Sequence, residues 1–338
     1  MEIRKQYEEF EETNLSKYAM LSKNSMGREQ AEEQCTIRTV FQRDRDRIIH
    51  SKSFRRLKHK TQVFIAPEGD HFRTRLTHTL EVAQIGRTLA RALKLNEDLI
   101  EAMALGHDLG HTPFGHTGEK VLNELHPNGF RHNEQSIRVV DLLEGKEKRI
   151  GLNLTYEVKE GILNHSGNRV SETLEGRILK YADRIAYINH DIDDAIRAHI
   201  IKQSDLPEDC LEVLGKTHGV RINTMIHDII ETSYNTNSIS MSKEIGEKTN
   251  KLRDFMFENV YLNKKAKSEE NKVEHIIKEL YKYYYENNNK IPQAHLSIYE
   301  NIEANIEDII CDYIAGMTDR YVINVFNNIF IPKRWEIF

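Results

Sequence analysis

Residues 107–119 read HDLGHTPFGHTGE and mark the point where a predicted helix meets a loop. The helix is expected over residues 97–108, with Asn96 as its N-cap and carboxylates in its first turn. Glycine and proline residues then break the helical pattern. A helix end beside such a permissive loop lets the adjacent side chains of His107 and Asp108 converge on one point.

Two residues from other predicted helices complete a candidate set of metal ligands. His78 starts a helix expected over residues 76–93, and Asp183 lies in a long helix expected over 174–199. Because apolar residues flank Asp183, its carboxylate must be paired, coordinated or neutralised. Imidazoles with carboxylates suit a divalent ion such as Mn, Fe, Ni, Co or Zn, with Mg also acceptable at a phosphate. The predicted ligands are His78, His107, Asp108 and Asp183.

The histidines of the chain are concentrated around this motif. Seven of the 16 lie between residues 71 and 132. For any one of them, a hydrogen bond within a helical core is a sufficient explanation, but the loop and the two outlying ligands favour a metal site for the set. Two other His-Asp dipeptides, His190-Asp191 and His227-Asp228, lack a glycine-rich loop, and we assign the second to an ordinary helix surface.

Further polar residues suggest phosphate chemistry. His116 and Glu119 are three apart at the start of a helix expected over 118–125, so the carboxylate can orient the imidazole. Arg75 precedes His78, which suits a polyphosphate substrate, although a surface salt bridge explains it as well. The basic stretch 42–62, QRDRDRIIHSKSFRRLKHKTQ, is equally consistent with a solvated helix face and with phosphate or effector contact.

Composition restricts the class of protein. The chain has 338 residues with 39% hydrophobic and 30% charged content, and its 6 Pro and 17 Gly leave room for long helices. Its net charge of −5 gives no global reason to expect nucleic-acid binding. No apolar run reaches the roughly 20 residues of a membrane span. Three distant cysteines and a charged first segment predict a cytoplasmic protein with reduced thiols.

The helical patterns predict an all-α fold with at most a small hairpin near residues 63–72. We expect a catalytic core over 1–200, opening with a helical segment to about residue 33, and a helical C-terminal extension over 201–338 packed on that core. Within the extension, residues 233–250 show no strong periodicity, and helical periodicity returns over 298–330.

Several blocks together resemble the HD-domain superfamily, and specifically its deoxyguanosine-triphosphate triphosphohydrolase-like family. These blocks are DRDRIIHSKSFRRLKHKTQVF, RLTHTLEVAQIGRTLAR, HDLGHTPFGHTGE, FRHNEQSIRVV, KYADRIAYINHDIDDA and DYIAGMTDRY. The HD ligands alone indicate the superfamily, whereas the third and fourth blocks are specific for this branch. The resemblance is weak over the polar stretch after about residue 200.

The resemblance implies a helical HD-domain core and hydrolysis of deoxynucleoside triphosphates to deoxynucleoside and tripolyphosphate. It assigns the metal to the four ligands named above, and catalysis to His116 with Glu119 and to His132. It implies phosphate contacts for Arg75 and Arg184. It also implies sugar contacts for Gln62, Tyr187 and Asp191. His111, which we assign to substrate binding, and His165 remain open between a second metal and the phosphate.

The resemblance also implies partners and leaves alternatives. Relatives of this kind form homo-oligomers, so we expect a tetramer or hexamer, with an effector deoxynucleotide at subunit contacts. Nucleic acid is not indicated, and no membrane is expected. An HD-type phosphodiesterase or nucleotidase would use the same ligands, often with extra histidines for a second metal. A third alternative is a nucleotide-sensing or single-strand-binding helical protein without turnover, which the basic segment could serve.

Overall fold

A computed structural model describes residues 2–62, 72–145, 149–263 and 269–333. The regular secondary structure of these residues is helical, with two isolated antiparallel bridges, Arg28 to Thr155 and Thr61 to Thr74, and no sheet among them. The predicted all-α fold is therefore confirmed. Except for Phe72, the stretch where a small hairpin is predicted lies outside the described residues.

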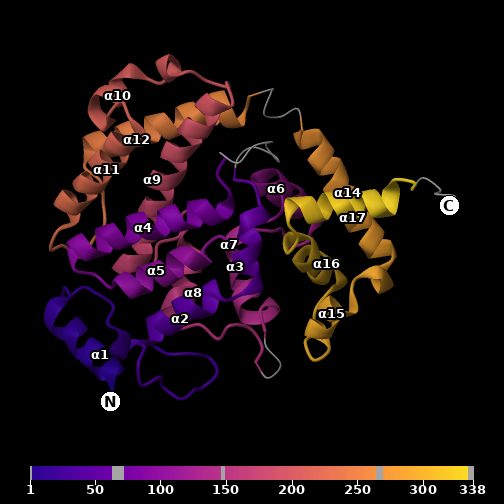
Figure 1. Cartoon of the computed structure of the whole chain (residues 1–338), viewed down its shortest axis with the longest axis horizontal. Coiled ribbons are helices and arrows are strands. Elements are labelled where there is room, and N and C mark those ends of the chain that lie inside the picture. The colour runs from indigo at the N-terminus through magenta and orange to yellow at the C-terminus, as the bar shows by residue number, and fades with distance from the viewer. Residues whose placement is uncertain (1, 63–71, 146–148, 264–268, 334–338) are drawn as a thin grey trace, which may run out of the picture.

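The helices run as follows along the chain (Figure 1). The first half contains α1 (Ile3–Asn14), α2 (Val40–Ile49), α3 (Lys52–Arg56), α4 (Arg75–Leu93), α5 (Glu97–Gly106), α6 (Gly115–Leu125), α7 (His132–Arg138), α8 (Tyr156–Asn164) and α9 (Leu174–Arg197). The second half contains α10 (Glu208–Leu214), α11 (His218–Ser233), α12 (Lys243–Met256), α14 (Glu270–Glu286), α15 (Gln293–Leu296), α16 (Ile306–Ala315) and α17 (Asp319–Phe330). Short 3-10 turns are η1 (Ser22–Asn24), η2 (Leu57–His59), η4 (Gln203–Asp205), η6 (Asn288–Lys290) and η7 (Ser297–Tyr299), and π-helical turns are η3 (Val139–Leu143) and η5 (Phe257–Tyr261).

The larger hydrophobic core lies where α4 packs against α5 and α9. On α4 the buried residues Val82, Ile85 and Leu89 recur at helical spacing, so one face of the helix is apolar. Helices α2, α8, α11 and α12 add side chains to the same cluster. The core therefore fixes the three helices from which the predicted metal ligands project.

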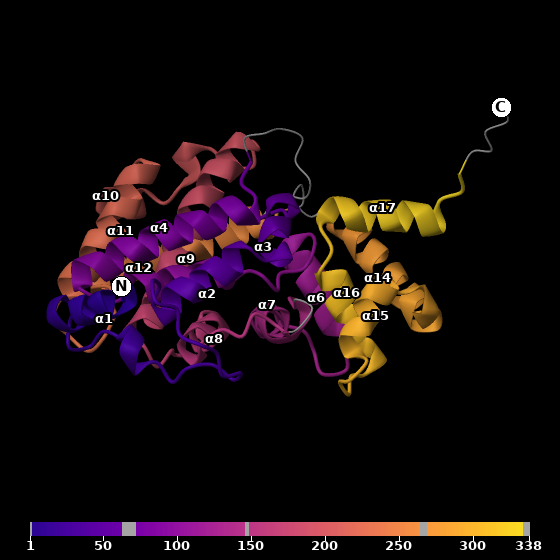
Figure 2. The same ribbon diagram turned by 60° about the horizontal axis from the view of Figure 1, so that its bottom comes forward.

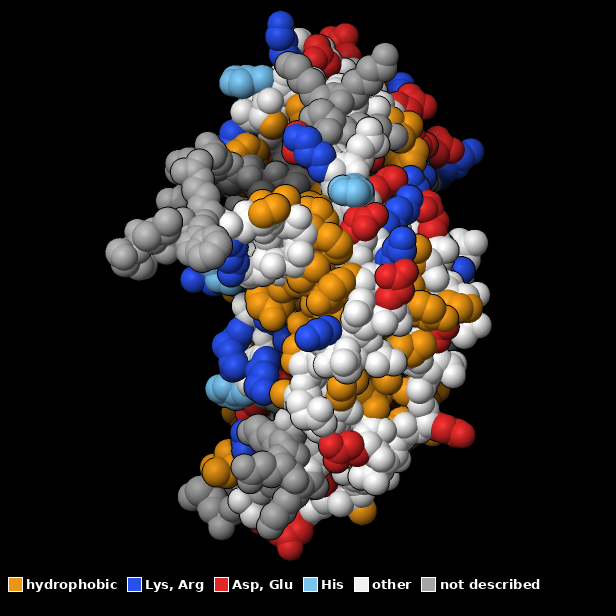
Figure 3. Space-filling model, turned by 90° about the vertical axis from the view of Figure 1, so that its right-hand side faces the viewer, with side chains coloured by type: hydrophobic (Ala, Val, Ile, Leu, Met, Phe, Trp, Pro, Cys, Tyr) orange, Lys and Arg blue, Asp and Glu red, His pale blue; other side chains and the backbone are white. Residues whose placement is uncertain are grey.

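A second hydrophobic cluster joins α6 to α14, α16 and α17. Figures 1 and 2 show these helices gathered at the end of the molecule that lies away from α1. Figure 3 faces this end and shows apolar side chains lying among charged ones. Exposed aromatic residues on α14 and α17 include Tyr285, Tyr321 and Phe330. The division of the chain at residue 200 remains a prediction.

Local interactions explain where the predicted helices begin and end. Asn96 caps α5 by accepting hydrogen bonds from the backbone N–H groups of Asp98 and Leu99, as expected. This helix ends at Gly106, two residues before the predicted end. Helix α6 begins at Gly115, three residues earlier than predicted.

Two stretches differ more from the sequence prediction. The opening helix ends at Asn14 rather than near residue 33, because Glu11 accepts hydrogen bonds from the backbone N–H and hydroxyl of Ser22 and turns the chain back. Residues 233–250, predicted to lack periodicity, contain the start of α12. Buried Thr249 takes an inward position between Ile245 and Leu252, so a polar residue interrupts the apolar pattern there.

The described helices give no candidate for a membrane span. None of them combines the length and the apolar composition that crossing a bilayer requires.

Candidate metal centre and substrate cavity

Four side chains from three helical segments meet beside the larger core. The Nε2 atom of His78 lies 3.1 Å from Oδ1 of Asp183 and 3.8 Å from Oδ2 of Asp108. The Nε2 atom of His107 lies 3.3 Å from Oδ1 of Asp108 and 3.9 Å from Oδ1 of Asp183. Such separations are those of atoms that can share one cation with bonds near 2.1 Å. The structure therefore brings the four predicted ligands together.

The hydrogen bonding of His107 suits a metal ligand. Its Nδ1 atom lies 2.6 Å from the carbonyl oxygen of Ala104, which requires the proton on Nδ1 and leaves the lone pair on Nε2. The Nε2 atom is buried and has no hydrogen-bond partner among the described residues. A buried acceptor without a donor is costly unless a cation occupies the position it faces. These residues therefore fit a divalent metal ion.

Electrostatics keep both carboxylates of this group ionised. Burial alone raises the pKa of Asp108, but the charges of His107, His111 and Arg75 hold that pKa well below its usual range. Burial likewise raises the pKa of Asp183, yet the hydrogen bond from His78 lowers it overall. A divalent ion requires ionised carboxylates and neutral imidazoles, so when bound it would supply the positive charge beside these carboxylates in place of the imidazolium groups.

Arg75 is part of this arrangement rather than of the surface. Its guanidinium donates a 2.9 Å hydrogen bond from Nη1 to Oδ2 of Asp108, and the residue is 2% exposed. The sequence also allowed a surface salt bridge as the explanation for Arg75. That explanation is wrong, because the ion pair is buried. Its Nε atom has no hydrogen-bond partner among the described residues, so the guanidinium keeps a free donor.

Three more histidines extend the group. The rings of His111 and His132 stack with centroids 4.2 Å apart, and Nε2 of His132 lies 3.3 Å from Nε2 of His165. Ligand atoms of Asp108, His111 and His132 all lie within 4.8 Å of one another. This spacing keeps a second cation and a phosphate contact both open for His111 and His165.

Glu119 orients His132 more closely than it orients His116. Its Oε1 atom accepts hydrogen bonds from the backbone N–H of His132 at 2.8 Å and from Nδ1 of the same residue at 2.9 Å. The Nδ1 atom of His116 is 3.5 Å from Oε2, and that side chain is 81% exposed. Burial lowers the pKa of His132, but the Glu119 carboxylate outweighs burial and raises it. Glu119 therefore contacts both histidines, but it makes hydrogen bonds of normal length only with His132.

A cavity of about 940 Å³ opens onto this group. Its walls include three residues predicted to contact the sugar: Gln62, Tyr187 and Asp191. Asp183, Tyr187 and Asp191 recur every four residues on α9, so they share one face at steps of about 6 Å. Arg184 is not among the residues that line the cavity, and its Nη1 atom donates to Oδ1 of Asn250 at 3.4 Å.

Part of the cavity wall comes from a region that carries no recognisable site motif. Arg253 on α12 and Phe257 and Tyr261 on the π-helical turn η5 line the cavity. The hydroxyl of Tyr261 donates to Oδ2 of Asp191. No motif in the sequence distinguishes these residues, and the one hydrogen bond that joins them to Asp191, from Tyr261, spans 70 positions.

The His190-Asp191 dipeptide also belongs to the site. The ring of His190 is buried with its centroid 5.0 Å from that of His78, and its Nδ1 atom pairs with Glu81 at 2.8 Å. From the sequence, Asp191 is expected at the sugar by resemblance, whereas His190 is assigned no role. Asp191 lies eight residues, or about two helical turns, after Asp183, and this spacing is a signal that places the dipeptide beside the candidate metal ligands. His227, in the other His-Asp dipeptide, is exposed on α11, as predicted.

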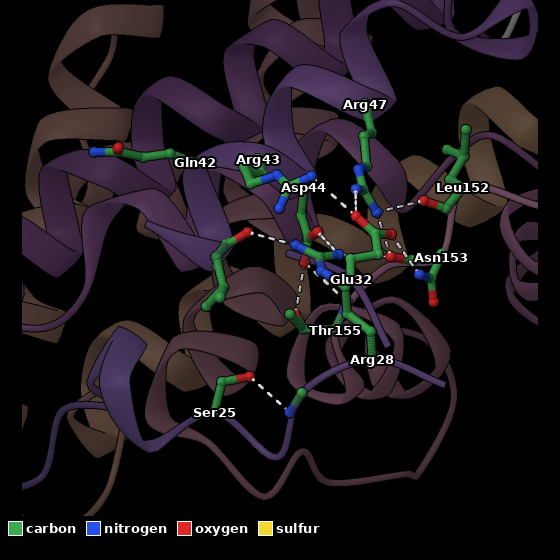
Figure 4. Close-up of polar contacts among 12 residues, drawn as sticks. Ser25, Arg28, Glu32, Gln42, Arg43, Asp44, Arg47, Leu152, Asn153 and Thr155 are labelled. Carbon is green, nitrogen blue, oxygen red and sulfur yellow. Dashed lines mark hydrogen bonds and ion pairs between the residues drawn. The ribbon is translucent and has the colours of Figure 1, made fainter. Parts of the chain in front are cut away.

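The basic stretch forms ion pairs within the protein (Figure 4). Arg43 and Arg47 both reach Glu32, and buried Arg28 pairs with Asp44. Lys52, Arg55 and Lys58 are exposed, so the alternative of a solvated face fits these three residues. The inner arginines instead hold neighbouring segments together.

Comparisons with known proteins agree with this geometry. Residues 75–188 match the HD domain model, and residues 239–328 match the phosphohydrolase-associated domain model. A deoxyguanosinetriphosphate triphosphohydrolase-like protein of Caldanaerobacter subterraneus is 58% identical over 99% of this chain and 98% of its own length. A protein of the same description from Clostridium perfringens is 53% identical over 98% of this chain and 99% of its own length.

A solved structure supports the fold alone. A phosphohydrolase from Bacteroides thetaiotaomicron shares 19% identity at a TM-score of 0.51, over 84% of this chain and 68% of that one. The near full-length relatives and the two domain models carry the assignment. The chain therefore belongs to the deoxyguanosinetriphosphate triphosphohydrolase-like family of HD-domain phosphohydrolases.

Proposed function

We propose that this protein hydrolyses deoxynucleoside triphosphates to deoxynucleoside and tripolyphosphate with the help of a divalent metal ion. The observation that carries the proposal is one cavity whose walls combine the His/Asp group, basic side chains and the Tyr187–Asp191 face of α9. A bound divalent ion neutralises phosphate charge and lowers the pKa of a water molecule. His78, His107, Asp108 and Asp183 would hold it.

The protein's own residues position the triphosphate. Arg75 and Arg253 line the cavity and provide guanidinium groups for phosphate oxygens. Tyr187, one turn after Asp183 on α9, offers a ring surface for the deoxyribose and leaves little room for a 2′-hydroxyl. Asp191 and Gln62 provide polar atoms for the 3′-hydroxyl, and Oε1 of Gln62 has no partner among the described residues.

The chemical step is attack of water on the α-phosphorus. A bond forms from the water oxygen to phosphorus, and the bond from phosphorus to the 5′-oxygen of the nucleoside breaks. A proton leaves the water and a proton reaches the departing 5′-oxygen. Exposed His116 at the cavity wall takes part in this transfer, and His132, held by Glu119, contacts the phosphate.

The test is product analysis with the four deoxynucleoside triphosphates, alone and in pairs, across several divalent metals. Tripolyphosphate as the phosphate product supports the proposal. Orthophosphate or pyrophosphate instead identifies an HD-type phosphodiesterase or nucleotidase, and binding without turnover identifies a sensor. Activity that needs a second nucleotide would support effector control, and mass measurement in solution would test the expected homo-oligomer.

A further inference from the structure

Asp319 joins three segments that are far apart in the chain. It is the first residue of α17 and is 4% exposed. Its Oδ1 atom accepts a hydrogen bond from the backbone N–H of Phe114 at 3.0 Å. Its Oδ2 atom accepts one from the backbone N–H of Thr61, also at 3.0 Å, and another from the Thr61 hydroxyl. One carboxylate thus connects α17 to Phe114, which lines the cavity, and to Thr61, the neighbour of the lining residue Gln62.

Lys60 makes a second connection between the same segments. Its ammonium group is buried and donates to the carbonyl oxygens of Ala315, at 2.8 Å, and His111. The carbonyl of Lys60 in turn accepts from the backbone N–H of Arg75 at 3.1 Å. The C-terminal ends of α16 and of the loop after α5 are therefore fixed relative to the start of α4.

Phe114 shows that this connection maintains an unfavourable backbone conformation. Its φ of +60° lies in the left-handed region, which residues with a side chain rarely adopt. The Asp319 hydrogen bond holds its N–H, and its ring is buried in the cluster formed with α14, α16 and α17. Both restraints come from the C-terminal helices.

Gly115 shows how closely the loop is seated. A Cβ atom there would lie 3.1 Å from Nη2 of Arg75 and 3.2 Å from the carbonyl oxygen of Gln62. Both neighbours line the cavity, so a displacement of the loop moves them or opens a gap. Placement errors of about 1 Å cost enzymes up to about a hundredfold in rate.

We infer that Asp319 is a positioning residue, through which the C-terminal helices place Gln62 and the loop of residues 109–114 in the cavity. For its effect on turnover the inference rests on the proposed function. The placement itself does not, because it concerns hydrogen bonds within the chain. This gives a role to the late block DYIAGMTDRY, which contributes no residue to the metal centre.

The test compares Asp319→Asn with Asp308→Asn. Asp308 also links α16 to the end of α6, through Nε2 of His126 at 2.9 Å, but lies outside the cavity. In Asp319→Asn the amide group can satisfy one of the two backbone N–H groups and faces the other with a donor. We expect hydrogen exchange of peptides covering Thr61 or Phe114 to accelerate about tenfold or more. Asp308→Asn should leave both unchanged.

The activity measurement separates positioning from folding. We expect Asp319→Asn to keep its metal and lower kcat/KM about 10- to 100-fold. Combined with Gln62→Ala, its effect should be less than the product of the single effects, because both changes act through Gln62. In the control double variant, the effects of Asp308→Asn and Gln62→Ala on kcat/KM should simply multiply. If Asp319→Asn does not fold, Thr61→Val, which removes the hydroxyl donor alone, should show the same coupling at smaller size.

Three results would overturn the inference: unchanged exchange in Asp319→Asn, unchanged kcat/KM despite faster exchange, or full multiplicativity with Gln62→Ala. If the wild-type protein hydrolyses no deoxynucleoside triphosphate, the proposed function fails. The exchange result would still decide the placement of the loop.

Discussion

Two buried polar clusters in this protein differ in how completely their atoms are paired. In the network around Asp44, Oδ1 accepts from Arg28 and Oδ2 accepts from the backbone N–H and hydroxyl of Thr155 (Figure 4). In the metal centre, Nε2 of His107 and Nδ1 of His111 have no hydrogen-bond partner among the described residues. A buried cluster whose polar atoms are all hydrogen-bonded stabilises the fold. A cluster that keeps unpaired polar atoms beside a cavity is suited to binding a ligand.

The strongest test of this contrast is Asp183→Ala. Removing one carboxylate from the metal centre should abolish metal binding and lower turnover by at least about a thousandfold. Metal content by elemental analysis and kcat are the measurements. Asp228→Ala, from the second His-Asp dipeptide on α11, where the carboxylate accepts from the backbone N–H of Ser242 and faces no candidate ligand, should keep both. Full turnover of a metal-free Asp183→Ala protein would refute the ligand assignment.

The paired cluster should show the opposite response. Asp44→Ala leaves buried Arg28 without its counter-charge, so we expect a loss of about 3–5 kcal/mol in the free energy of unfolding. Urea unfolding measures it, and kcat per folded molecule should not change. Asp46→Ala, on the same helix but half-exposed, should cost below about 1 kcal/mol. Equal losses in the two variants would contradict the contrast.

Glu175 extends the comparison because its buried Oε2 atom has no hydrogen-bond partner among the described residues, yet the residue lines no part of the cavity. Its Oε1 atom accepts from the backbone N–H groups of Met20 and Asn96, and burial raises its pKa from 4.5 to about 7. The folded state thus holds a proton that the unfolded state loses above pH 4.5. The stability from this group is complete below pH 4.5 and is lost as pH rises through 7, by about 3 kcal/mol.

Glu175→Gln copies the protonated form, so it should flatten the pH dependence of unfolding between pH 4.5 and 7. Urea midpoints measured across that range test this. Glu172→Gln, at an exposed position nearby, should follow the wild-type curve. A Glu175→Gln protein with the wild-type slope would show that this carboxyl is ionised throughout.

The smallest expected effect concerns orientation within the metal centre. Glu119→Gln weakens the hold on Nδ1 of His132 without touching the four ligands. We expect metal content to stay constant and kcat to fall about 10- to 100-fold. Glu124→Gln, exposed on the same helix, should be neutral. Loss of metal in Glu119→Gln would mean that Glu119 supports the ligands instead.

Much of the fold and half of the site follow from local sequence. The start of α5 is set by Asn96, and the burial of α4 follows its apolar spacing, so both were predicted within a few residues. Helix α12 was not, because buried Thr249 hides its periodicity. Arg253 and Tyr261, which lie on or next to α12, were missed for the same reason.

The sequence by itself determined the helical class, because a helix repeats every 3.6 residues whatever surrounds it. Short motifs that resemble a known family indicated the family and the four side chains that meet at the candidate metal centre. The tertiary structure decided which arginines are paired and that Tyr261 covers Asp191. It also decided that Asp319 reaches Thr61 and Phe114. The contacts of Tyr261 and Asp319 join residues 70 to 258 positions apart, and no periodicity within a segment encodes which distant segment will pack against it.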